Sequence, residues 1–141
     1  MASTVKPTPI ALVVCDSIYM EPGGKTALVG LFNSISAQTF PCKHPRMAVF
    51  ASLTGLRNAS TAKLEIVHAE NDRVVVSAQG EFPEVESPLM VVDMNFIFNN
   101  VIFPEEGTYY IRFWANDHLL VMRPFTVGSV KKQGDRKNAS H

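Results

Sequence analysis

The alternation of apolar and polar residues with a period of two is the feature that most constrains the fold of this chain. In segment 89–99 (LMVVDMNFIFN) an apolar face lies opposite Asp93, Asn95 and Asn99, and its members are Met90, Val92, Met94, Phe96 and Phe98. In segment 62–69 Leu64 alternates with Lys63 and Glu65. Successive side chains of a β-strand point to opposite faces, so this period predicts strands that bury one face. A long segment with the 3.6-residue period of an amphipathic helix is not found.

Nine prolines and eight glycines separate the alternating segments and mark turns between them. The connections are too short for crossover helices, so neighbouring strands are expected to be antiparallel, and two packed sheets bury both apolar faces. The fold class predicted is all-β, a two-sheet antiparallel β-sandwich of about eight strands. The expected strands are 10–16, 26–35, 46–56, 62–69, 73–80, 89–99, 108–115 and 118–127.

A length of 141 residues suits one domain with one core. Residues 1–9 are expected to form a flexible arm, residues 10–128 the β-sandwich, and residues 129–141 a basic flexible tail. The last eleven residues, KKQGDRKNASH, hold four basic side chains and one acidic one. Such an end is most often a solvated one.

Lys and Arg together number 13, as do Asp and Glu, so the formal net charge is zero. A general nucleic-acid binder usually has a basic excess, so no nucleic-acid partner is predicted. The apolar run 10–15 is too short for a signal peptide, and no run approaches the roughly 18 apolar residues of a membrane span. A cytoplasmic protein without a membrane partner is the expectation.

Cys15 and Cys42 are the two cysteines, and both are expected to be reduced thiols. Cys42 lies close to His44, but a zinc site needs about four ligands, or three and a water. No metal site and no cofactor are therefore predicted.

Segment 23–26 (GGKT) has the ending of a phosphate-binding loop, but a strand follows it where a helix is required. Serines and histidines are present without the strand-turn-helix context of a nucleophile elbow. The sequence therefore predicts no catalytic residues and no enzyme.

Asp16 closes the first apolar strand, where a buried carboxylate must find hydrogen-bond donors. The backbone N–H groups of residues 17–19 could supply them in an Asx-turn. We therefore expect Asp16 to have a structural role.

The last predicted hairpin carries the candidate binding residues. If Asn116-Asp117 is a two-residue turn, Trp114 lies opposite Leu119 and Arg112 lies opposite Val121. Arg123 then joins the same face, and we call Tyr110, Arg112, Trp114 and Arg123 the hairpin strip. Its composition is typical of protein interfaces and could also hold a sugar or a base. Two alternatives are that Trp114 covers the edge of the core beneath the arginines, and that a one-residue bulge exchanges which residues face out.

Segments 103–109 (FPEEGTY) and 119–127 (LLVMRPFTV) resemble the closing hairpin of immunoglobulin-like sandwiches, in which Gly107 and Tyr109 fit a tyrosine corner. Together with Cys15-Asp16 and segment 28–32 (LVGLF), they make residues 10–128 resemble a family of small bacterial proteins known only as a domain of unknown function. This resemblance implies an immunoglobulin-like fold with structural roles for Gly107 and Tyr109, and it implies no activity or ligand.

The function predicted is that of a non-enzymatic protein-interaction or structural module. Strands that are apolar on both faces, such as 10–15, favour self-association, because a sandwich core covers one face of each sheet. The partner is thus an unidentified protein or a second copy of the chain in a homo-oligomer. The alternative is a small-ligand or carbohydrate-binding domain that uses the hairpin strip.

Overall fold

The computed structural model describes residues 6–57 and 61–130, which contain nine β-strands and no helix. The all-β prediction is confirmed. The arm and tail predicted at the two ends lie largely outside the described residues, since only residues 6–9 and 129–130 of them are included. The strands are β1 (Thr8–Met20), β2 (Thr26–Leu31), β3 (Ser34–Ala37), β4 (Cys42–Thr54), β5 (Thr61–His68), β6 (Val74–Glu81), β7 (Val91–Phe103), β8 (Gly107–Ala115) and β9 (His118–Ser129).

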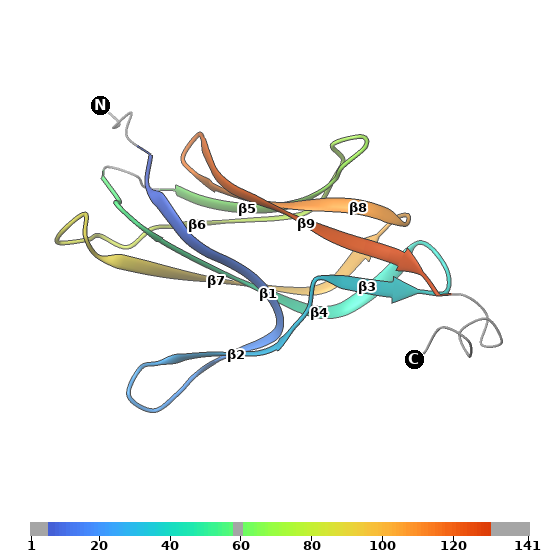
Figure 1. Ribbon diagram of the computed structural model, residues 1–141, viewed down its shortest axis with the longest axis horizontal. Helices are drawn as coiled ribbons and strands as arrows, with labels where there is room; N and C mark the ends of the chain where they lie inside the picture. The colour runs from blue at the N-terminus through green and yellow to red at the C-terminus, as the bar shows by residue number, and fades with distance from the viewer. Residues whose placement is uncertain (1–5, 58–60, 131–141) are drawn as a thin grey trace.

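The strands form two sheets packed face to face (Figure 1). The four-stranded sheet has the order β2-β1-β4-β7, and the five-stranded sheet has the order β3-β9-β8-β5-β6. Strands β1, β4 and β7 occupy the places of strands A, B and E of an immunoglobulin domain, and β5, β8 and β9 occupy those of C, F and G. The fold is therefore an immunoglobulin-like β-sandwich, in which every strand pair is antiparallel except β3 with β9.

The segment 26–35, expected as one strand, forms two strands in different sheets. Strand β2 pairs with β1 in the four-stranded sheet, whereas β3 runs parallel to β9 in the five-stranded sheet. Phe32 donates its backbone N–H to the Val14 carbonyl at 3.1 Å, and the Asn33 carbonyl accepts from Thr126 at 3.3 Å. The chain thus crosses between the sheets at residues 32–33, because the backbone groups there bond first to one sheet and then to the other.

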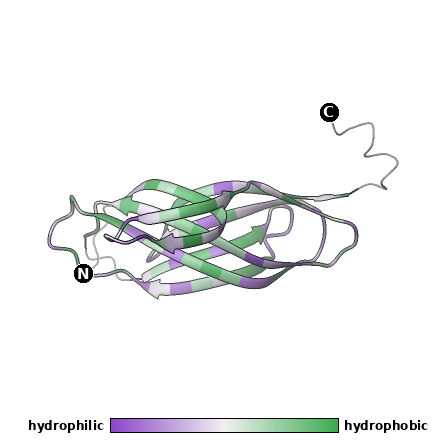
Figure 2. Cartoon of the chain, turned by 90° about the horizontal axis from the view of Figure 1, so that it is seen from below, coloured by the Kyte–Doolittle hydropathy of each residue, from purple (hydrophilic) through white to green (hydrophobic). Residues whose placement is uncertain are grey.

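The core lies between the sheets and contains the inward side chains of both. Figure 2 shows the sheets as stacked layers whose strands alternate between apolar and polar residues. Tyr109 and Phe125 both contact Phe103, with ring centroids 5.1 and 6.0 Å away. Asn100 has a positive φ of 56°, and beyond it Val101 and Phe103 again point into the core. This reversal extends β7 past the alternation visible in the sequence.

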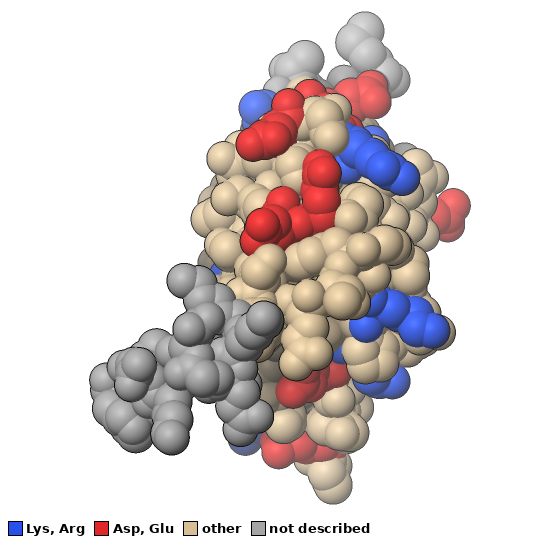
Figure 3. Space-filling model, turned by 90° about the vertical axis from the view of Figure 1, so that its right-hand side faces the viewer, with Lys and Arg blue, Asp and Glu red and all other residues tan. Residues whose placement is uncertain are grey.

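Acidic and basic side chains are interspersed on the end of the sandwich shown in Figure 3. Neither sign of charge covers a continuous region of that end of the molecule. On this end the charges are thus mixed, in keeping with the equal numbers of acidic and basic residues in the chain.

Candidate functional site

The outer face of the five-stranded sheet carries most of the predicted hairpin strip. Ile111 and Phe113 of β8 are fully buried in the core, so Tyr110, Arg112 and Trp114 alternate onto the opposite face. The Asn116-Asp117 turn follows, with Asn116 at a positive φ of 50°. Three of the four predicted strip residues are thus brought together on one face.

Arg123 does not join them. Trp114 pairs with Leu119 as predicted, but Arg112 pairs with Met122 instead of Val121, because the register shifts between Phe113 and Trp114. The extra residue in β9 turns Val121 and Arg123 toward the inner face and leaves Met122 on the outer one. The predicted placement of Arg123 on the outer face is therefore wrong. The reason is the one-residue bulge that the sequence left open as an alternative.

A buried carboxylate organises the strip. Glu65 of β5 is 7% exposed, and its Oε1 accepts hydrogen bonds from Arg112 Nε and from Trp114 Nε1, both at 2.9 Å. Arg112 Nη2 also lies 2.9 Å from Glu65 Oε1, and its Nη1 lies 3.9 Å from Asp72 Oδ1. The Glu65 charge is thereby paired and hydrogen-bonded, as a buried charge requires.

The indole ring of Trp114 is flanked by two cations. Lys63 Nζ lies 4.7 Å from the ring centroid, and Arg112 Cζ lies 5.8 Å from it. The Arg112 guanidinium, the Trp114 N–H and the indole ring are therefore engaged within the chain, as in the predicted alternative of a packing role. Sequence reasoning placed Lys63 and Glu65 facing outward but gave no signal that β5 pairs with β8, so their part in the strip was missed.

The surroundings of Asp16 differ from the predicted Asx-turn. Strand β1 continues past Asp16 to Met20 and pairs with β2 there, so residues 17–19 form no Asx-turn around Asp16. Its side chain is exposed and lies against Gly30, where an added Cβ would come within 2.5 Å of Asp16 Oδ2. The carboxylate thus restricts the neighbouring strand sterically.

Tyr109 forms the tyrosine corner that the resemblance implied. Its hydroxyl donates to the Glu105 carbonyl at 2.5 Å, and its ring meets His68 edge to face at 4.8 Å. Burial raises the pKa of Tyr109, whereas the backbone N–H of Glu105, which donates to the phenol oxygen at 3.4 Å, opposes that rise. Gly107 has a φ of 142°, and a Cβ there would lie 3.2 Å from His68 Nε2. The packing of this corner therefore favours glycine at position 107.

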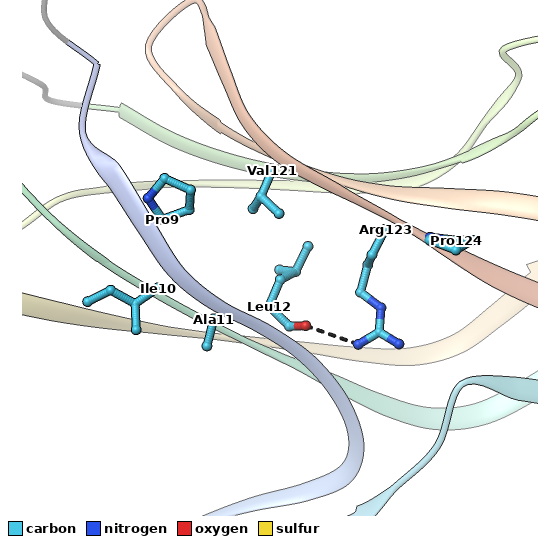
Figure 4. A pocket seen from close by; sticks show the side chains of 7 residues that line it. All are labelled: Pro9, Ile10, Ala11, Leu12, Val121, Arg123 and Pro124. Carbon is cyan, nitrogen blue, oxygen red and sulfur yellow. Dashed lines mark hydrogen bonds between the residues drawn. The ribbon is translucent and has the colours of Figure 1, made fainter.

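A groove of about 370 Å³ opens between β1 and β9 at one edge of the sandwich (Figure 4). Arg123 reaches across it and donates from Nη1 to the Leu12 carbonyl at 3.0 Å. Its Nη2 donates to Asn33 Oδ1, and its Nε is buried without a partner. The lining residues are Pro9, Ile10, Ala11, Leu12, Val121, Arg123 and Pro124.

One row of the outer face of the four-stranded sheet is apolar across all four strands, with polar residues such as Ser17, Asn95 and Asn99 beside it. Leu31 pairs with Cys15, Cys15 with Ala48, and Ala48 with Ile97, which makes one straight row. Cys15 and Ala48 are fully buried, whereas Leu31 is 63% and Ile97 42% exposed. Two small side chains thus lie between two exposed large ones. Val13, Phe50 and Val29 continue the surface, which we call the apolar face.

Cys15 and Cys42 are free thiols, and burial raises the pKa of each. His44 lies on β4 with Cys42 and packs against Phe32 at a centroid distance of 5.6 Å. Within residues 6–57 and 61–130, no group of three or more His, Cys, Asp or Glu side chains is arranged to hold a metal ion. No helix with the length and hydrophobicity of a membrane span occurs in the same ranges.

The conserved-domain comparison matches residues 10–128 to a family of unknown function, DUF6941. The chain belongs to this family. The match covers the sandwich from β1 to β9, and so the DUF6941 domain of this chain is the immunoglobulin-like fold described above. The resemblance inferred from the sequence is confirmed.

Among solved structures, this DUF6941 protein is similar to an immunoglobulin-like protein from Pseudomonas aeruginosa. The two share 8% sequence identity with a TM-score of 0.44, over 89% of this chain and 99% of the other. A comparison with curated proteins found no match to this DUF6941 chain.

Proposed function

We propose that this protein is a non-enzymatic interaction module that associates with a second copy of itself through the apolar face. The observation that carries the proposal is the row Leu31–Cys15–Ala48–Ile97, which exposes large apolar side chains on both margins of one sheet. Contiguous exposed apolar surface on a folded domain usually marks an interaction site. By contrast, the hairpin strip is engaged internally through Glu65.

The charges at the two ends of the apolar face favour a second copy as the partner. Arg46, which pairs with Asn99, lies at one end of this face, and Asp93, which pairs with Ser52, lies at the other. These ends are about 20 Å apart along β4. A two-fold axis in the interface, perpendicular to the strands, brings Arg46 of each copy over the partner's Asp93. The face is therefore complementary to itself in an antiparallel arrangement.

The size of the face predicts how strongly two copies associate. Four strands spaced about 4.8 Å apart, each about six residues long with about three side chains on the face, give a footprint of about 20 by 20 Å. An interface of this size, about 400 Å² on each copy, is smaller than a standard specific interface and falls among those of weak, transient complexes. A reversible dimer with a dissociation constant of about tens of micromolar is the expected result.

Sedimentation velocity of the full chain over a concentration series tests the proposal. We expect Ile97→Glu and Leu31→Glu to shift the population to monomer, because each places a desolvated charge in the interface. Met122→Glu is the matched control, since Met122 is 46% exposed on the outer face of the other sheet and should leave the dimer intact. A wild-type chain that stays monomeric at about 100 µM contradicts the proposal.

A charge exchange tests the antiparallel arrangement separately. Arg46→Glu and Asp93→Arg should each weaken the dimer, whereas the double variant should recover part of the lost association. Recovery in the double variant is specific to a geometry that brings positions 46 and 93 together. If the double variant is weaker than both single variants, this arrangement is wrong.

A further inference from the structure

The groove between β1 and β9 is bordered by two strand edges that have no neighbouring strand within the described residues. Strand β1 pairs with β2 only from Cys15 onward, and β9 pairs with β3 only from Thr126 onward. The earlier part of each strand is therefore open on that side. At one end the linker at residues 32–33 crosses between the sheets and closes the groove.

The groove combines apolar walls with one cation. Leu12 and Val121 project toward each other between the strands, with Pro9 and Ile10 beside them (Figure 4). Arg123 is half-buried, and its guanidinium lies at one end of this apolar wall. A cavity of about 370 Å³ with this lining falls in the size range of small-molecule sites.

The charge of Arg123 has no counter-charge in this part of the chain. The ion pairs formed by the described residues involve His68, Arg112, Glu65, Glu105 and Asp72, and none includes Arg123. Its two donated hydrogen bonds go to neutral oxygens of Leu12 and Asn33. Guanidinium groups bind carboxylates with paired, charge-assisted hydrogen bonds, so a carboxylate is the group best suited to this position.

From these observations we infer that the groove binds an aliphatic carboxylate, with its chain along Leu12 and Val121 and its carboxylate on Arg123. The site is distinct from the apolar face of the proposed dimer. A sugar would require several polar partners, whereas the groove offers apolar walls and one guanidinium. A peptide added as an extra strand would need backbone N–H groups on the bordering edges, and Pro9 and Pro124 supply none at their positions.

The test is a titration of the full chain with octanoate, followed by the backbone amide signals in two-dimensional NMR spectra. Octanol is the control ligand, since it has the same chain without the charge. We expect saturable shifts of Leu12, Val121 and Arg123 at octanoate concentrations below about 5 mM, and weaker binding of octanol by about tenfold.

Variants of two arginines identify the group that binds the carboxylate. Arg123→Gln should weaken octanoate binding by about tenfold or more, whereas Arg73→Gln, at an exposed position outside the groove lining, should leave it unchanged. Thermal unfolding of each variant reports whether the fold is retained. If Arg123→Gln does not fold, the octanoate–octanol comparison on the wild type still decides the result.

Three outcomes overturn the inference. They are the absence of octanoate binding, equal binding of octanoate and octanol, and shifts that do not saturate or that lie outside the groove. Repeating the titration on Ile97→Glu separates this result from that of the proposed dimer, because Ile97 does not line the groove.

Discussion

At the scale of single residues, Glu65 and Arg112 form the centre of a group of polar contacts on the outer surface of the five-stranded sheet. Glu65 is nearly buried, and one of its carboxylate oxygens accepts from both Arg112 and Trp114. Removal of one member of such a group costs more than the interaction itself, because the other members remain desolvated and unpaired. Arg112 and Trp114 therefore stabilise the five-stranded sheet through Glu65.

Glu65→Ala should lower the free energy of unfolding by about 2–3 kcal/mol, since it leaves Arg112 and the Trp114 N–H without their acceptor. Arg112→Ala should cost a similar amount, because it leaves the nearly buried Glu65 carboxylate without its cation. Glu65→Ala/Arg112→Ala should cost clearly less than the sum of the two single variants. Urea unfolding measures all three. Glu84→Ala, at an exposed position, is the control that should change little. Additive costs would show that the pair is not coupled.

Strand β2 is the element least attached to the core. None of its residues belongs to the buried cluster, and β1 is its one strand neighbour among the described residues. Gly30 of β2 has a positive φ of 74° and lies against Asp16 of β1. Both the backbone conformation and the close approach favour glycine there.

Gly30→Ala should destabilise the protein by about 2 kcal/mol, in part through the backbone and in part through contact with Asp16. Asp16→Ala in the same chain should restore part of the loss, because it removes the closest contact, with Oδ2, and leaves the backbone strain and the contact with Cβ. Thermal unfolding measures the difference. Gly128→Ala is the control, since a Cβ there has no atom within 4 Å. A double variant no more stable than Gly30→Ala would show that Asp16 is not the obstacle.

At the scale of the whole molecule, stability in alkali depends on buried groups that are neutral in the native state. Burial raises the pKa of Tyr109 above its ordinary 10.0, and it raises those of Cys15 and Cys42 above 9.0. The native state then binds more protons than the unfolded state above these values, so stability falls as the pH increases. The contribution of Tyr109 is fully present below about pH 10.

Tyr109→Phe should therefore be less stable than the wild type by about 1–2 kcal/mol at pH 8, because it loses the hydrogen bond to Glu105. The difference should shrink as the pH rises above about 10, where the wild-type phenol loses its proton on unfolding. Urea unfolding at a series of pH values measures it, with the exposed Tyr19→Phe as control. A difference in stability that stays constant as the pH rises above about 10 would contradict the raised pKa of Tyr109.

The local sequence determined the fold class, most strand positions, the turn at Asn116 and the tyrosine corner. These features depend on residues close together in the chain, such as the alternation in 89–99 and the four-residue separation of Tyr109 and Glu105. Periodicity and turn propensity are local properties, and so they are visible without the tertiary structure.

Only the tertiary structure decided which strands pair and which face each side chain occupies. The pairing of β5 with β8 brings Glu65 to Arg112, 47 residues apart, and one extra residue in β9 turns Arg123 inward. The crossing at residues 32–33 likewise creates β3 and, with it, the closed end of the groove. Such pairings depend on the packing of whole sheets, because a single-residue change in register exchanges the two faces of a strand.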